Sequence, residues 1–565
     1  MCRRFGFCHL LTVCLLVTFT TALDPEIETK INDFANHLLT CREIVGLNIA
    51  VVQDDALVFK NGYGVQDLDT STPVTDKTIF GIASLTKAFT ATLLGQVLKD
   101  NGYSWSTKVR DVLGSDFYLH DGLRTSQATM QDLGSHTLGI LNHNKARFEG
   151  LSRRDAAFKL RFFEPTSPFR NSHNYNNAMY GLMAYITETI SGKSWEDTLK
   201  EYIFDPAGMS STTFSHFINQ SRQDIARPYL TDFDTHEQRQ MSLAFHSFWG
   251  KSGGSGSIMS NTEDMAQWLR LQLANGKIEG QEVISEDVIE ETKANINRIV
   301  QSSGYDAYKR PNIPVTYAQT GYGLGWRLGW YRGLRMHLHT GTSWGYGALL
   351  TLLPDMNIGI YTGVTGADDG YLGRRMLQMY VMDLLLGEEP WLNQTTACSF
   401  PEPWTPARTK TAKKTDGRPA VVTDSEQYVG TYGNFQYGNV TFAVDDSSRL
   451  VLQYGDFGRW NLIETGTENE FSGLGAELMW AEFVNSIKFS DQDGSQFQTV
   501  TIDFERTAPA VFSRGLMMSE AYPPPDPEGC GSDPLPQQPG DSAATSAVKP
   551  FLLFLALLVS IFRIY

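Results

Sequence analysis

A serine and a lysine three residues apart form the segment of this sequence best suited to nucleophilic chemistry. Ser84 and Lys87 directly precede residues 90–98, whose apolar side chains recur at helical spacing. Residues three apart share a helix face, so the Lys87 amine can reach the Ser84 hydroxyl. Serine is a poor nucleophile unless a base removes its proton, and a lysine whose pKa is lowered by burial or nearby cations can be that base. The spacing predicts a nucleophile and its base at a helix start.

Ser-x-x-Lys alone is a weak signal, because such pairs arise by chance and a helix cap beside a surface lysine would also explain it. Two further motifs, Tyr175-Asn176-Asn177 and His339-Thr340-Gly341, follow it in order. With them the sequence resembles the serine β-lactamase and penicillin-binding protein family, specifically its class C-like branch, with signature S-x-x-K, Y-x-N and [KH]-T-G. The resemblance covers most of residues 45–385 and includes the stretches 130–139 and 259–268.

The resemblance implies a role for each matched residue. Ser84 would be the acylated nucleophile, and Lys87 and Tyr175 would form its base system, provided that nearby cations lower the tyrosine pKa. The backbone N–H groups of Ser84 and Thr342 would form the oxyanion hole, and Asn177 would bind the substrate's amide side chain. No metal or cofactor is implied. The implied substrate-binding residues are Asn177, His339, Gly341 and Thr342.

His339 departs from the penicillin-recognising pattern, which has a permanently charged lysine at this position. Histidine is only partly protonated near neutral pH. A substrate carboxylate would therefore be bound more weakly, which favours ester, amide or peptide substrates over β-lactams.

Three other residues could carry chemistry. Ser343 lies in a G-x-S-x-G pattern, but that nucleophile motif needs a following helix, and residues 346–353 are predicted to form a strand. His337 and His339 share a strand face and could bind a metal, yet no third ligand has motif spacing, which favours a packed or substrate-facing histidine. His136 could be a triad base, although its loop is structural in the resembled family, and a structural role is favoured.

Apolar periodicity predicts the elements that position these residues. Residues 26–39 and 373–386 are expected to be helices, and Ser260 with Glu263 predicts a capping box at another helix start. Short connections between successive strands predict an antiparallel sheet with helices packed on its faces. The resemblance adds a helical subdomain, giving an α/β (α+β) β-lactamase-like fold. The strands expected are 46–52, 56–63, 334–339, 347–353 and 358–362.

A second, smaller domain is predicted after a proline-rich break. Period-two alternation in 440–444, 450–454 and 500–504 predicts an all-β domain, a barrel or a sandwich, and the resemblance implies a β-barrel appendage. The predicted segments are a signal peptide 1–22, a β-lactamase-like domain 23–392, a linker 393–424, a small β-barrel 425–516, a stalk 517–546 and a hydrophobic tail 547–565.

Sequence patterns at both ends of the chain predict that the protein enters the secretory route. Arg3 and Arg4 precede an apolar run and the small residues before position 22, as in a cleaved signal peptide. Residues 551–562 are an apolar run of twelve, against about 20 for a spanning helix. Small residues upstream favour a GPI-attachment signal, with a short tilted membrane anchor as the alternative. Glycosylation sequons that fit a secretory route start at Asn219, Asn393 and Asn439.

The net charge limits the classes of binding partner, and the cysteine content limits the possible disulfides. Asp and Glu (63) exceed Lys and Arg (47), giving a net charge of -16, which argues against binding nucleic acid or an anionic membrane through charge. Signal cleavage leaves Cys41, Cys398 and Cys530, and spacing alone does not decide which two pair. The resemblance implies Cys41–Cys398, because that fold packs its first and last helices side by side.

These observations predict a secreted or surface-tethered serine hydrolase that acts on ester, amide or peptide substrates through an acyl-enzyme on Ser84. Hydrolysis and transfer to another acceptor stay open, as does the oligomeric state. The alternative is a non-catalytic acidic component of an extracellular or calcified matrix that retains the fold.

Overall fold

The computed structural model of the chain describes residues 22–219, 221–232, 237–299, 310–367, 372–404, 417–422, 424–505 and 509–516. Residues 1–21 of the predicted signal peptide, residues 405–416 and 423 of the linker, the stalk with Cys530 and the hydrophobic tail lie outside the described residues. Within the described ranges, no helix is both long enough and apolar enough to cross a membrane.

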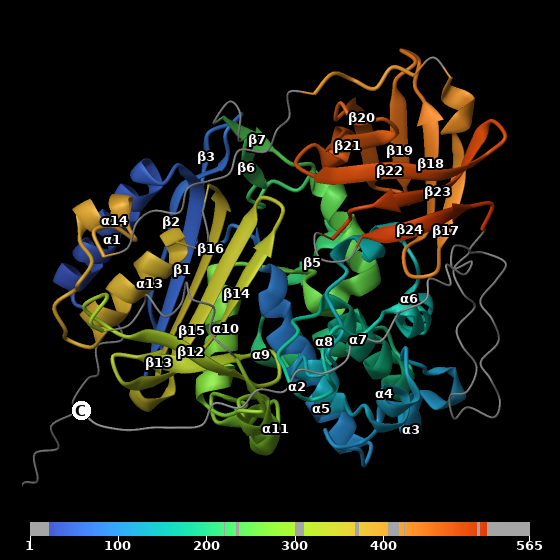
Figure 1. Cartoon of the computed structure of the whole chain (residues 1–565). Helices are drawn as coiled ribbons and strands as arrows, with labels where there is room; N and C mark the ends of the chain where they lie inside the picture. Colours follow the sequence, from blue (N-terminus) through green and yellow to red (C-terminus); the bar gives the residue numbers. More distant parts are fainter. Residues whose placement is uncertain are drawn as a thin grey trace, which may run out of the picture. The chain divides into compact units, whose positions relative to one another are not determined.

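Over the residues that the structure describes, nine strands form one antiparallel sheet (Figure 1). The first two strands, β1 and β2, form a hairpin that joins the sheet beside β16, a strand from much later in the sequence. All five strands predicted for this domain are present, and the antiparallel sheet is confirmed. In sheet order the strands are β11 (Asn297–Arg298), β12 (Tyr317–Tyr322), β13 (Arg327–Tyr331), β14 (Leu334–Ser343), β15 (Tyr346–Leu353), β16 (Ile358–Gly366), β1 (Ile44–Gln53), β2 (Ala56–Asp67) and β3 (Thr72–Pro73).

Helices cover both faces of this sheet. Two of them, α1 and α13, bury apolar side chains on one face, and α2 and α10 pack on the other (Figure 1). The predicted helices 26–39 and 373–386 correspond to α1 and α13. The helices are α1 (Pro25–Cys41), α2 (Thr86–Asp100), α3 (Val109–Leu113), α4 (Gly122–Gln127), α5 (Met130–Gly134), α6 (Arg153–Lys159), α7 (Asn177–Ser191), α8 (Trp195–Leu199), α9 (Asp205–Ala207), α10 (Thr262–Leu273), α11 (Glu286–Thr292), α13 (Leu372–Leu385) and α14 (Gln394–Ser399).

Short strands complete the larger domain around the helical subdomain. A three-stranded sheet runs β4 (Phe80–Gly81), β8 (Ile258–Ser260) and β5 (Thr213–Phe214). The two hairpins are β6 (Tyr229–Thr231) with β7 (Gln238–Gln240) and β9 (Lys277–Ile278) with β10 (Gln281–Glu282). Because β4 leads directly into the Ser84 segment, its pairing with β8 fixes the position of the backbone just before the predicted nucleophile.

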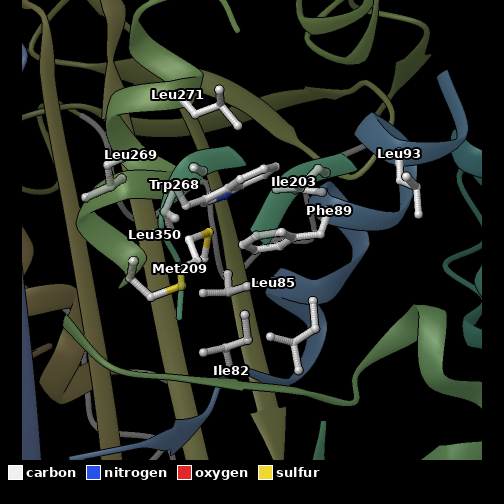
Figure 2. Packing of buried hydrophobic residues seen from close by; sticks show 14 of the residues in the cluster. Ile82, Leu85, Phe89, Leu93, Ile203, Met209, Trp268, Leu269, Leu271 and Leu350 are labelled. Atoms are coloured by element: carbon white, nitrogen blue, oxygen red, sulfur yellow. The ribbon is translucent and has the colours of Figure 1, made fainter. Parts of the chain in front are cut away.

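Helix α2, which follows Ser84, is buried along most of its length (Figure 2). The Phe89 ring of α2 stacks on the Trp268 ring of α10, with centroids 3.6 Å apart. Leu350 of β15 belongs to the same cluster, so sheet, α2 and α10 form one core. Burying an aromatic side chain contributes on the order of 2 kcal/mol. This packing makes the start of α2 a rigid support for the reactive residues.

The start of α10 differs from its sequence prediction. The N-cap residue is Asn261, whose side chain accepts a hydrogen bond from the Asp264 N–H, and the Ser260–Glu263 capping box is not formed. Ser260 is instead fully buried in β8, where its hydroxyl lies 2.8 Å from the Thr212 hydroxyl. The prediction was wrong because Asn261 is an equally good cap one residue later.

The second domain is a closed barrel of eight strands within the described part of the chain. Closure removes the unpaired edges that a sandwich would leave, and it settles the choice between barrel and sandwich. A single buried cluster joins the barrel interior to Phe148, Phe248 and Trp249 of the larger domain. The strands are β17 (Gly430–Asn434), β18 (Gly438–Val444), β19 (Leu450–Tyr454), β20 (Gly458–Glu464), β21 (Glu470–Gly475), β22 (Phe483–Asp493), β23 (Gln496–Ile502) and β24 (Ala510–Arg514).

A disulfide joins Cys41, the last residue of α1, to Cys398 in α14. Their Cα atoms lie 5.5 Å apart, within the normal range for a disulfide. The pairing is the one that the resemblance implied, and it ties the two ends of the larger domain together.

Candidate active site

Ser84 lies in a short 3-10 turn, η1 (Ala83–Leu85), that runs directly into α2. Ala83 has a left-handed φ of 46°, an uncommon conformation for a residue other than glycine and one that is found at functional sites. The Ser84 Oγ lies 3.0 Å from Lys87 Nζ and accepts a hydrogen bond of 2.9 Å from the Tyr175 hydroxyl. The structure therefore brings the three predicted catalytic side chains together.

The Lys87 amine is fully buried and surrounded by oxygen atoms. Besides Ser84 Oγ, its Nζ lies 2.7 Å from Asn177 Oδ1 and 2.8 Å from the backbone carbonyl of Ser255. Burial, and then the charges of Arg147 and Arg327, hold the pKa of Lys87 well below its usual value. Each of these effects disfavours the charged amine, and the amine nitrogen lies beside the serine hydroxyl.

The Tyr175-Asn176-Asn177 motif leads into α7, with Asn176 as its N-cap. The Asn177 side chain donates to Asn144 Oδ1 at 2.8 Å, and its backbone N–H donates to Asn142 Oδ1 at 3.0 Å. These two asparagines come from the loop after the 130–139 stretch. Asn177 is thus held from one side by this loop, while its Oδ1 faces Lys87 on the other.

His136 holds the Tyr175-Asn176-Asn177 motif through a hydrogen bond to its backbone. It is buried, and its Nδ1 accepts a hydrogen bond of 3.1 Å from the Asn176 N–H. Burial, followed by the nearby charges, holds the pKa of His136 well below its usual value, so the ring is neutral. Its ring centroid lies 4.6 Å from that of Tyr175, but none of its hydrogen bonds reaches Ser84. His136 positions the tyrosine loop, which agrees with the favoured structural role.

His339 occupies the lysine position of the third motif and is buried. Its Nε2 lies 3.0 Å from the Tyr322 hydroxyl, and its Nδ1 lies 2.8 Å from the carbonyl oxygen of Thr340. Because a carbonyl only accepts, Nδ1 carries the proton and Nε2 accepts from the tyrosine. Burial, then the charges of Arg327 and Lys87, keeps the pKa of His339 well below its usual value. The ring is neutral, and both nitrogens already have partners.

Gly341 and Thr342 lie at the end of β14, beside the Ser84 segment. A Cβ atom at position 341 would come within 2.2 Å of the Ile82 carbonyl oxygen, so only glycine allows this close approach. Arg374 of α13 donates to the Gly341 carbonyl at 2.8 Å and to the Thr342 hydroxyl at 3.0 Å. The strand that was predicted to bind substrate is therefore fixed against both the nucleophile turn and a buried arginine.

Several of these residues line one cleft of about 900 Å³. Ser84, Tyr175, Asn177, His339 and Thr342 all contribute to its walls. The barrel supplies another part of the wall through the segment between β21 and β22. The cleft-lining residues of that segment and its flanking strands are Leu474, Trp480, Ala481, Glu482 and Phe483.

Two arginines make this cleft positive near the nucleophile. Arg147 stacks on Trp249, with its guanidinium carbon 4.3 Å from the ring centroid, and burial lowers its pKa to about 10. Arg327 lies at the start of β13, 5.9 Å from the centroid of the Tyr175 ring. Both contribute to the low pKa of Lys87. Sequence analysis missed these cations, and no motif spacing marks them. Other cleft residues missed are Asn142, Asn144, Arg374 and Glu482.

The remaining predicted sites are not among the partners of Ser84 Oγ and Lys87 Nζ described above. Ser343 also lines the cleft, but β15 follows it rather than a helix, and its Oγ accepts a hydrogen bond of 3.1 Å from the Trp249 indole. Among the described residues, the one group of three or more His, Cys, Asp or Glu side chains close enough to hold a metal is His37, Cys41 and Cys398, and its cysteines form the disulfide. Of the sequon asparagines, Asn219 and Asn393 are exposed and Asn439 is half-buried.

Comparison with known proteins places these features in context. A family model described as Beta-lactamase matches residues 31–378. Unguisins hydrolase ungD of Aspergillus violaceofuscus is 28% identical over 378 residues, which cover 65% of this chain and 66% of that protein. Gigasin-6 of Magallana gigas is 26% identical over 238 residues, covering 41% of this chain and 78% of that protein. The chain thus spans slightly less than two thirds of the ungD protein.

A solved structure shows the same fold. The octameric penicillin-binding protein homologue from Pyrococcus abyssi superposes with a TM-score of 0.55 at 19% sequence identity, covering 86% of this chain and all of that one.

Proposed function

The chain belongs to the β-lactamase family of serine hydrolases, and from that premise we propose that it hydrolyses ester or amide bonds through an acyl-enzyme on Ser84. The proposal assigns Lys87 and Tyr175 to the base system and Asn177, His339, Gly341 and Thr342 to substrate binding.

The arrangement around Lys87 Nζ carries this proposal. A neutral amine has two hydrogens and one lone pair. The Asn177 Oδ1 and Ser255 carbonyl oxygens, at 2.7 and 2.8 Å, can only accept hydrogen bonds, so they take both hydrogens. The lone pair is left for the third neighbour, the Ser84 hydroxyl at 3.0 Å. The low pKa of Lys87 supports the neutral amine that this requires.

The proposed reaction has two halves. The Ser84 oxygen attacks the substrate carbonyl while its proton passes to Lys87, directly or through the Tyr175 hydroxyl. The backbone N–H groups of Ser84 and Thr342 stabilise the oxyanion, a contribution of several kcal/mol. The bond to the leaving alcohol or amine then breaks, and that group takes up the proton. Water attacks the acyl-enzyme with the same base, releasing the acid and restoring Ser84.

The state of His339 supports esters, amides and peptides over penicillins. Its ring is neutral, and its two nitrogens are engaged by Tyr322 and Thr340. A substrate carboxylate would therefore meet no positive charge from residue 339, where penicillin-recognising members have a lysine. Weak acylation by a penicillin is expected beside efficient acylation by uncharged esters.

Adduct mapping on the full chain tests the proposal. The protein is treated with a fluorophosphonate or, separately, a penicillin, and modified residues are mapped by mass spectrometry. The expected fluorophosphonate adduct is on Ser84, lost in Ser84→Ala and retained in Ser343→Ala, the matched control from the same cleft. A folded wild-type protein without an adduct on Ser84 would refute the acyl-enzyme and favour the matrix-component hypothesis.

We also propose that the protein is secreted and tethered to the cell surface by a GPI anchor. The exposed sequons at Asn219 and Asn393 and the Cys41–Cys398 disulfide support an oxidising, secretory route. Cells expressing the full chain should carry it on their surface and release it with phosphatidylinositol-specific phospholipase C. Surface protein that resists this enzyme would instead support the short membrane anchor.

A further inference from the structure

We infer that Glu482, a carboxylate of the C-terminal barrel, is a positioning residue for the Ser84 centre because it ties together two walls of the cleft. The inference rests on the proposed function, since it assigns Glu482 a task in the proposed reaction. Glu482 lies just before β22 and itself lines the cleft.

The two oxygens of this carboxylate bind different walls. Oε1 accepts a hydrogen bond of 2.7 Å from the Trp344 indole, and Oε2 lies 3.2 Å from Lys145 Nζ. The side chains of Glu482 and Lys145 are only 16% and 18% exposed. A carboxylate so poorly solvated is costly unless its oxygens are paired, and both of these are. Glu482 therefore connects the two walls, and loss of either Trp344 or Lys145 would leave its carboxylate incompletely paired.

Lys145 connects Glu482 to the catalytic lysine. It belongs to the short turn η3 (Asn144–Glu149), and its neighbour Asn144 accepts the hydrogen bond from the Asn177 side chain. The opposite end of that side chain, Oδ1, is one of the acceptors that orient Lys87. The path from the barrel carboxylate to Lys87 therefore runs through the Lys145 side chain, one peptide unit and the two amide side chains of Asn144 and Asn177.

The barrel holds this loop at further points, among them a hydrogen bond of 3.2 Å that the Tyr454 hydroxyl donates to the Ala146 carbonyl. The Lys145 backbone N–H donates to the Glu505 carboxylate at 3.2 Å, and the His143 ring lies 2.9 Å from the Tyr437 hydroxyl. The loop that positions Asn177 is thus supported from outside its own domain. The hydrogen bonds of Glu505 and Tyr437 to the larger domain reach this loop, whereas Glu482 also reaches the other wall.

Trp344 is the other attachment point. It lies at the turn between β14 and β15, two residues after Thr342, whose N–H group is assigned to the oxyanion hole. Its ring packs edge-on against Phe245 and Phe248, with centroids 5.0 and 5.3 Å away. By holding Trp344 and Lys145 at once, Glu482 sets the separation between the oxyanion strand and the loop that orients the base.

Glu477 provides a matched control on the same barrel segment. It is 68% exposed, its closest ionic partner is Arg459 at 3.5 Å, and it does not line the cleft. Replacing either glutamate with glutamine removes one negative charge from the same region of the surface. Only the change at position 482 removes a charge that binds residues from two walls of the cleft.

The test measures fluorophosphonate labelling of Ser84 in the full chain, separating the maximal rate from the probe concentration at half-maximal rate. Glu482→Gln should lower the maximal rate about tenfold, because a small displacement of the base is costly, and should leave the half-maximal concentration unchanged. Glu477→Gln should match the wild type. Lys145→Met should lower the rate similarly, and the double variant Glu482→Gln/Lys145→Met should lose little more, because both changes break one contact.

The outcomes separate this inference from the proposed function. Wild-type labelling on Ser84 with an unchanged rate in Glu482→Gln, or fully additive losses in the double variant, would overturn the positioning role alone. Absence of labelling in the wild type would overturn the acyl-enzyme itself, and this inference with it. If Glu482→Gln does not fold, Trp344→Phe removes the other hydrogen bond while keeping an aromatic ring, and it should also lower the maximal rate.

Discussion

Lys87 and His339 are two buried basic side chains in the same cleft, yet their surroundings give them different chemistry. Burial is the largest cause of the low pKa in both, and the charge of Arg327 lowers both further. The Lys87 amine is bounded by two obligate acceptors and a serine hydroxyl, so that in the proposed neutral form its lone pair is left for the serine. The His339 ring is held by a tyrosine hydroxyl and a backbone carbonyl, which use both nitrogens.

A lowered pKa does not by itself identify a catalytic base. Desolvation lowers the pKa of each group, and the hydrogen-bond partners decide whether its basic nitrogen is available to a reacting group. Lys87 is available to Ser84, whereas His339 is a neutral part of the strand that lines the cleft. The two residues should therefore respond differently to substitution and to pH.

The largest expected effect is at Lys87. Lys87→Met removes the proposed base and should slow Ser84 labelling by a fluorophosphonate about 10²- to 10⁴-fold, the usual range for general-base catalysis. Lys99→Met is the control, since Lys99 lies on the same helix but is exposed and paired with Asp287. A Lys87→Met protein that is folded and labelled at the wild-type rate would remove the distinction between the two residues.

The pH dependence should follow Lys87 and not His339. The Lys87 amine must be unprotonated to accept the Ser84 proton, so labelling should fall as pH drops through its lowered pKa, by about tenfold per pH unit below it. His339→Gln should retain this acidic limb, because the His339 ring is already neutral there. The measurement is the rate of Ser84 labelling in the wild type and the variant at pH values from about 4 to 9, the range in which these groups can titrate. Loss of the limb in His339→Gln would assign it to the histidine.

A smaller effect is expected from the tyrosine that holds His339. Tyr322→Phe leaves the buried Nε2 atom without its donor and should cost about 1–3 kcal/mol in the free energy of unfolding. Labelling of Ser84 should change less than about tenfold, because Tyr322 does not contact the base. Chemical denaturation and labelling rates measure the two effects, with Tyr103→Phe as an exposed control. A catalytic loss as large as that of Lys87→Met would contradict the proposed difference.

The smallest effect on catalysis is expected from removing the Cys41–Cys398 disulfide, which lies far from both residues. The double variant Cys41→Ser/Cys398→Ser removes a cross-link between positions 357 residues apart and should lower the free energy of unfolding by about 2–4 kcal/mol. Ser84 labelling should stay at the wild-type rate under conditions where the variant is folded. A selective loss of labelling in the folded variant would show that the disulfide supports the cleft as well as stability.

Local patterns predicted much of the fold. Strands 347–353 and 358–362 and helix 373–386 are each defined by their own apolar periodicity, and the structure places them within a few residues of the predicted bounds. The start of α10 was less predictable, because Ser260 and Asn261 are both good cap residues. Only burial of Ser260 in β8 decided between them.

For the site, the sequence by itself determined the residues whose relation is local. The three-residue spacing of Ser84 and Lys87 on one helix face brings their side chains together in any fold that forms this helix. The later motifs named Tyr175, Asn177 and His339 through their resemblance to a known pattern. Only the tertiary structure decided that Arg147 and Arg327 lower the Lys87 pKa and that Glu482 spans the cleft. Those contacts join distant segments, and their geometry depends on the packing of whole elements, which no spacing along the chain records.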